Sequence, residues 1–140
     1  MREFSILHVD DDDAAALLMR VALQEISPHV HYDRLGDVDK ALHLLAASVE
    51  QPGLSLPQLI LLDLNLPRKS GFEMFRAIRE SPPLAHICVV VFTSSVASGD
   101  RNRALALGAS SYVIKPAAFE DFLAVLRDAI KLAEHAELTS

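Results

Sequence analysis

Two stretches of this 140-residue chain consist entirely of apolar residues over the length of a β-strand, 59–62 (LILL) and 87–92 (ICVVVF). A strand with one face in water alternates apolar and polar residues, whereas an unbroken apolar run predicts cover on both faces, as in a parallel sheet. Each run ends at a polar residue, Asp63 after the first and Thr93 after the second. The sequence therefore predicts a buried parallel sheet whose strands deliver polar side chains to one edge.

Strand and helix patterns alternate along the rest of the chain. Strands are predicted at 4–9, 29–35, 58–63, 87–92 and 111–114, and helices at 14–26, 37–49, 71–79, 100–107 and from 118 onward. In the first helix, the residues at helical spacing that are predicted to face the core are Leu17, Leu18, Val21, Ala22 and Ile26. This alternation predicts one doubly wound α/β domain over residues 1–140, with five parallel strands, five helices and right-handed crossovers.

Composition excludes several classes of protein. The formal net charge is −6, and Lys and Arg form no cluster, which argues against direct nucleic-acid binding. No apolar stretch is long enough to span a bilayer, so no membrane association is expected. Cys88 is the only cysteine, which excludes an intrachain disulfide and fits the cytoplasm. The six histidines, His8 among them, show no ligand spacing and are expected to pack or to contact solvent.

Five polar residues follow or end four of the predicted strands: Asp10, Asp11, Asp63, Thr93 and Lys115. In doubly wound sheets the binding site lies beyond the carboxyl ends of the strands, so one pocket could gather all five. Carboxylates that meet there repel one another unless a cation binds, and oxygen ligands of this kind suit Mg²⁺. Asp63 is then a candidate nucleophile that forms an acyl phosphate, with Lys115 and Thr93 holding the phosphoryl oxygens.

Four motifs along nearly the whole chain, VDDDD, DLNLPRKSG, FTSS and SYVIKP, resemble the receiver (CheY-like) domain of two-component response regulators. The resemblance implies a flavodoxin-like sheet with strand order 2-1-3-4-5. It also implies that Asp63 is the phospho-acceptor and Lys115 the phosphoryl-binding lysine, and that the Lys115–Pro116 bond is cis. Metal ligands would be Asp11, Asp63 and the backbone carbonyl of Asn65, with Asp10 acting through water, and the switch residues would be Thr93 and Tyr112.

The same resemblance implies a histidine kinase as partner and no catalysis beyond the chain's own phosphorylation and dephosphorylation. No output domain follows the last helix, so the chain is expected to be a stand-alone receiver. The segments DLNLPRKSGF, SPPLAHI and TSS are similar to small regulators paired with bacterial phytochrome-type kinases. Such regulators often dimerise through the fourth helix, fifth strand and fifth helix, here about residues 100–132.

Two alternatives come from other classes of function. A magnesium-dependent phosphohydrolase would also use an aspartyl phosphate, but its DxD motif wants a second acid where Asn65 stands. A phosphorylation-independent interaction module could use the same fold and would bind magnesium without taking up a phosphoryl group.

Overall fold

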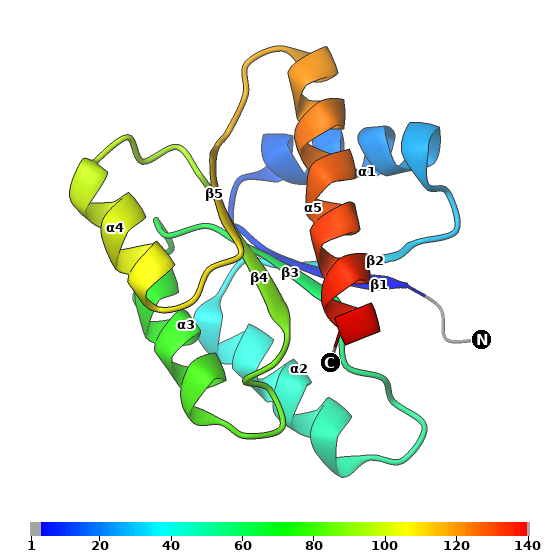
Figure 1. The fold of residues 1–140 in the computed structure, drawn as a ribbon, viewed down its shortest axis with the longest axis vertical. Helices are drawn as coiled ribbons and strands as arrows, with labels where there is room; N and C mark the ends of the chain where they lie inside the picture. The colour runs from blue at the N-terminus through cyan, green and yellow to red at the C-terminus, as the bar shows by residue number, and fades with distance from the viewer. Residues whose placement is uncertain (1–3, 140) are drawn as a thin grey trace.

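The computed structural model describes residues 4–139, and side chains through residue 137. Five strands alternate with five helices along the chain (Figure 1). The elements are β1 Ser5–Val9, α1 Asp13–Ile26, β2 His31–Leu35, α2 Val38–Glu50, β3 Leu59–Leu62, α3 Gly71–Glu80, β4 Cys88–Thr93, α4 Ser98–Ala106, β5 Ser111–Ile114 and α5 Phe119–Thr139. Each predicted element is present, with ends displaced by up to a few residues.

The strands form one parallel sheet in the order β2-β1-β3-β4-β5, which confirms the predicted topology. In register, Val9 lies beside Leu62, Leu62 beside Val91, and Thr93 beside Ile114. The strands therefore finish at nearly the same level, and the residues that follow them lie at one edge of the sheet.

Helices cover both faces of the sheet, with α1 and α5 on one face and α2, α3 and α4 on the other (Figure 1). Successive residues of β3 alternate between the two apolar cores, Ile60 and Leu62 facing one and Leu59 and Leu61 the other. All four are at most 1% exposed. The unbroken apolar run is thus explained by burial on both sides.

The predicted core-facing stripe of α1 was wrong at three positions. Leu17, Leu18 and Val21 are 63%, 38% and 45% exposed. The buried residues of the helix are Ala15, Ala16, Met19, Ala22 and Leu23. Apolar residues occur on every side of this helix, so their spacing does not select a face, and the side that packs against the sheet carries three alanines together with Met19 and Leu23.

Aspartates cap the first two helices, as helix N-termini with unpaired N–H groups require. Asp12 Oδ1 accepts from Ala14 N at 3.0 Å, and Asp37 Oδ1 accepts from Lys40 N at 3.0 Å. Ser70 occupies the N-cap of α3, but its side chain makes no capping hydrogen bond. Within residues 4–139, no helix combines the length and hydrophobicity needed to cross a membrane.

Candidate functional site

The polar residues predicted to meet do so at the carboxyl edge of the sheet. Asp10 and Asp63 directly follow β1 and β3, Thr93 is the last residue of β4, and Lys115 directly follows β5. Because all these strands run parallel, their carboxyl ends bring the four side chains into one cluster. Asp11, next to Asp10, is exposed at its rim.

Asp63 is the centre of this cluster and is only 3% exposed. Its Oδ1 accepts a hydrogen bond from Thr93 Oγ1 at 2.8 Å and another from the Asn65 backbone N–H at 3.1 Å. Its Oδ2 accepts from Lys115 Nζ at 3.0 Å. Both carboxylate oxygens are therefore held in place by groups from other segments.

Gly71 lets the chain pack directly behind Asp63. A Cβ at position 71 would lie 2.3 Å from the Asp63 backbone oxygen and 2.9 Å from the Leu64 Cα. The Gly71 N–H donates to the Leu64 carbonyl at 3.0 Å. The start of α3 thus braces the backbone that carries the central carboxylate.

Lys115 pairs with two acids of the cluster, and its Nζ also lies 3.7 Å from Oδ2 of the neighbouring Asp12. Its Nζ lies 2.8 Å from Asp10 Oδ2 and 3.0 Å from Asp63 Oδ2. Burial alone would lower the pKa of this ammonium, but its contacts with Asp10 and Asp63 outweigh that effect and raise the pKa above its usual value. Lys115 is thus held in its charged form between the two carboxylates.

Asp10 is fully buried and strongly held as a carboxylate. Burial would raise its pKa, but hydrogen bonds from His8, Lys115 and the Asp12 backbone N–H lower the pKa from 3.8 to about 2. Its Oδ1 accepts from Asp12 N at 2.9 Å. The residue therefore brings a permanent negative charge to the cluster.

The donor set fits a divalent cation. Carboxylate oxygens of Asp10, Asp11 and Asp63 lie within 4.8 Å of one another. Against three carboxylates stands one ammonium, Lys115, which leaves a formal charge of −2 on the cluster. Hard, negatively charged oxygen ligands are those that Mg²⁺ and Mn²⁺ prefer.

Tyr112 lies in the core beside this cluster rather than in it. The residue is 7% exposed, and its hydroxyl donates to the Ser95 carbonyl at 3.0 Å. The Ser95 backbone N–H in turn donates to Thr93 Oγ1 at 3.3 Å. The structure therefore connects Tyr112 to Thr93 through one residue of the β4–α4 loop.

The Lys115–Pro116 bond is trans, so the predicted cis form was wrong; a prolyl bond favours trans by about 0.5–1 kcal/mol.

One member of the buried network was missed by sequence reasoning. His8 is 0% exposed, and its Nε2 lies 3.1 Å from Asp10 Oδ2. Its Nδ1 lies 2.7 Å from the Tyr32 hydroxyl. A signal was available, because residues two apart on a strand point to the same face, so a His-Val-Asp sequence at the end of β1 places His8 and Asp10 side by side.

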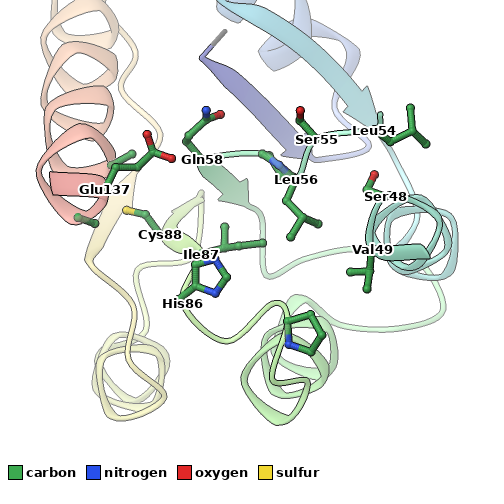
Figure 2. Close-up of a pocket in the computed structure, with 14 residues that line it drawn as sticks. Ser48, Val49, Leu54, Ser55, Leu56, Gln58, His86, Ile87, Cys88 and Glu137 are labelled. Atoms are coloured by element: carbon green, nitrogen blue, oxygen red, sulfur yellow. The ribbon is translucent and has the colours of Figure 1, made fainter. Parts of the chain in front are cut away.

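A separate hollow of about 580 Å³ lies at the other edge of the sheet, between α5 and α2 (Figure 2). Gln58, which precedes β3, and Cys88, which begins β4, line it together with Glu137 of α5. These positions are the amino ends of the strands, so the hollow is distinct from the cluster around Asp63.

A family model described as "Response regulator receiver domain" matches residues 6–127. A curated relative, "Probable methanogenesis regulatory protein FilR2" of Methanothrix harundinacea, is 40% identical over 84% of this chain and 76% of its own length. Several other curated relatives are longer proteins, of which the chain spans between 22% and 52%.

Solved structures with similar folds include one phosphorylated response regulator and one metal-bound response regulator. The phosphorylated cyanobacterial phytochrome response regulator RcpA has a TM-score of 0.81 and 30% identity, covering 91% of each chain. The Mn²⁺-bound form of response regulator Rcp1 has a TM-score of 0.77 and 31% identity, covering 89% of this chain and 90% of its own. Response regulator Rcp1 of Synechocystis sp. is 32% identical over 87% of this chain and 83% of its own length.

Proposed function

This chain belongs to the family of response regulator receiver domains, and from that premise we propose that it accepts a phosphoryl group on Asp63 from a histidine kinase. The observation that carries the proposal is the arrangement around Asp63, whose two carboxylate oxygens contact Thr93 and Lys115 while Asp10 and Asp11 lie within reach. Receiver domains are signalling modules, and the catalysis we propose is limited to the chain's own phosphorylation and dephosphorylation.

In the proposed reaction, a carboxylate oxygen of Asp63 attacks the phosphorus of the kinase's phosphohistidine. The new O–P bond forms as the P–N bond breaks, and the departing imidazole nitrogen keeps the electron pair and takes up a proton. Lys115, already 3.0 Å from Asp63 Oδ2, would pair with an oxygen of the transferred group. The Thr93 hydroxyl would turn its hydrogen bond from the carboxylate to the phosphoryl group.

We infer that Asp10, Asp11 and Asp63 hold Mg²⁺, with the Asn65 backbone carbonyl as a further ligand and Asp10 acting through water. The support is the net negative charge of the cluster and the Mn²⁺ bound by the similar protein Rcp1. When bound, such a cation would neutralise charge on the phosphoryl oxygens.

Phosphorylation is proposed to change the surface formed by α4, β5 and α5. If Thr93 moves toward a phosphoryl group, its contact with Ser95 and hence the Tyr112 hydroxyl contact change with it. Apolar residues exposed on these three elements include Leu105, Ile114 and Leu132, at 42%, 48% and 38% exposure. We propose that this surface, about residues 100–132, binds a downstream protein or a second copy of the chain.

The phospho-acceptor is tested with acetyl phosphate as donor. Wild-type chain should take up one phosphoryl group in the presence of Mg²⁺, detected as a mass increase that is lost on mild alkaline treatment, since acyl phosphates are labile. Asp63→Asn should take up none, while Asp33→Asn, an exposed acid on β2, should behave as wild type. Undiminished labelling of Asp63→Asn would refute the assignment. Continuous turnover of small phosphate esters would instead support the hydrolase.

The kinase and the assembly need separate tests. Similarity to RcpA and Rcp1 supports a phytochrome-type kinase as partner, and a cytoplasmic location would follow from such a pathway. A panel of autophosphorylated kinases that includes a phytochrome-type kinase should show fastest transfer from that one. Light scattering with and without beryllofluoride should show a mass change that Ile114→Asp prevents, and a constant mass would contradict dimerisation through this surface.

A further inference from the structure

A series of three hydrogen-bonded side chains, each buried or half-buried, connects the edge strand β2 to the cluster around Asp63. The Tyr32 hydroxyl of β2 contacts His8 Nδ1 at 2.7 Å, and His8 Nε2 contacts Asp10 Oδ2 at 3.1 Å. The same Asp10 oxygen lies 2.8 Å from Lys115 Nζ. His8 and Lys115 therefore share one carboxylate oxygen.

The chemistry of the groups fixes the direction of the hydrogen bond between His8 and Asp10. An ionised carboxylate only accepts, so His8 Nε2–H donates to Asp10. For the neutral ring, Nδ1 then has only a lone pair, and the Tyr32 O–H donates to it. In that form the Tyr32 hydroxyl is compatible with the tautomer that presents a donor to Asp10. The His8 ring is also held by its neighbours, because Phe92 packs edge-on against it at 6.3 Å between ring centroids.

Resting on the proposed function, we propose that His8, backed by Tyr32, is a positioning residue that holds the Asp10 carboxylate for divalent-cation binding at the Asp63 cluster. Asp10 Oδ1 accepts from the Asp12 N–H, and Oδ2 accepts from both His8 and Lys115. Together these contacts hold the Asp10 carboxylate in one orientation. Without His8, Lys115 is the remaining side-chain partner of Oδ2 among these contacts. Asp10 would then turn toward Lys115, which weakens both the metal site and the Lys115 contact with Asp63.

The test measures Mn²⁺ affinity by electron paramagnetic resonance of the free ion, with no phosphoryl donor present. His8→Leu removes both hydrogen bonds at similar side-chain volume and should weaken binding about 10- to 100-fold, as loss of a partner that orients a ligand does. His8→Gln, which offers an amide N–H near the place of Nε2–H, should recover part of the affinity. In an Asp10→Asn background, His8→Leu should have no further effect.

The chain contains a matched control. His31 Nε2 lies 2.9 Å from Asp33 Oδ2, the same His-X-Asp spacing, but both side chains are more than half exposed and lie on β2. His31→Leu should leave Mn²⁺ affinity unchanged. If His8→Leu fails to fold by circular dichroism, Tyr32→Phe, which loses only a hydroxyl, should still show a smaller loss of affinity.

Equal Mn²⁺ affinity in His8→Leu and wild type, or in Tyr32→Phe where that variant stands in, overturns the inference. So does an equal loss in His31→Leu, which would indicate a general charge or stability effect. Failure of the wild type to take up phosphoryl groups would instead refute the proposed function, while the Mn²⁺ comparison would still decide the role of His8.

Discussion

Gly71→Ala and Gly99→Ala are the same chemical change and should have opposite effects. At Gly71 the added Cβ would lie 2.3 Å from the Asp63 backbone oxygen, below the 3.0 Å limit that real Cβ contacts observe, and the obstructing atoms are backbone. The chain must therefore shift by at least about 0.7 Å there, and overpacking of this kind costs about 1–3 kcal/mol.

At Gly99, in the first turn of α4, an added Cβ meets no atom within 4 Å and the φ angle is not positive. Alanine loses less backbone entropy than glycine on entering a helix, so Gly99→Ala should raise the free energy of unfolding by up to about 1 kcal/mol. The two variants thus bracket the wild type.

Urea unfolding followed by circular dichroism gives both free energies. Because the shift at Gly71 falls on the residue that carries the proposed phospho-acceptor, phosphoryl uptake from acetyl phosphate should also fall, by about 10- to 100-fold, as displacements near 1 Å cost. Gly99→Ala should label at the wild-type rate. A Gly71→Ala chain as stable and as fast as wild type would refute the bracing role of α3.

Two other measurements follow from the structure. The Arg79 guanidinium donates to the carbonyls of Ala85, Ile87, Leu107 and Gly108 at 2.7–3.3 Å. Arg79→Leu should therefore lower the free energy of unfolding, measured in urea, by about 2–4 kcal/mol, and a loss under about 1 kcal/mol would contradict this. Arg79→Lys should recover only part of the loss, because an ammonium lacks the planar fork of donors. The pKa of Asp10 is lowered from 3.8 to about 2 despite its burial, so its contribution, about 2 kcal/mol, is present above pH 3.8 and lost as the pH falls through 2. Asp10→Asn should accordingly lose less stability than wild type between pH 4 and pH 2, and parallel acid profiles would count against the hydrogen bonds described.

The gathering of Asp10, Asp63, Thr93 and Lys115 could be predicted from sequence because each stands at the carboxyl end of an apolar run. Because all strands of a parallel sheet run in the same direction, their carboxyl ends lie at the same side of the sheet and bring these four residues together. Knowledge of the strand order was not needed to place these residues together. The resemblance to receiver domains supplied the order and the roles.

Other features depend on pairings that a single sequence does not specify. Tyr32 reaches His8 because β2 and β1 are in the register that sets Tyr32 beside Ile6, two residues from His8 on the same face. The outer face of α1 was misassigned for a different reason: Leu17 and Met19 are both apolar, and only packing against the sheet decides which is buried. Ser70 stands at the N-cap of α3 without making the side-chain hydrogen bond that its residue type favours at this position.

The sheet order has a consequence for the lifetime of individual contacts. β2 pairs with β1 alone and its residues are half-buried or exposed, whereas β1, β3 and β4 are each paired on both sides. Amide hydrogen exchange should therefore be faster in β2 than in those three strands, as local opening favours sparsely packed edges. Tyr32, the outer member of the chain that ends at Asp10, sits on that fast-opening strand. The buried network around Asp10 thus has one end on an edge strand, where local opening should interrupt its hydrogen bonds more often than at the centre of the sheet.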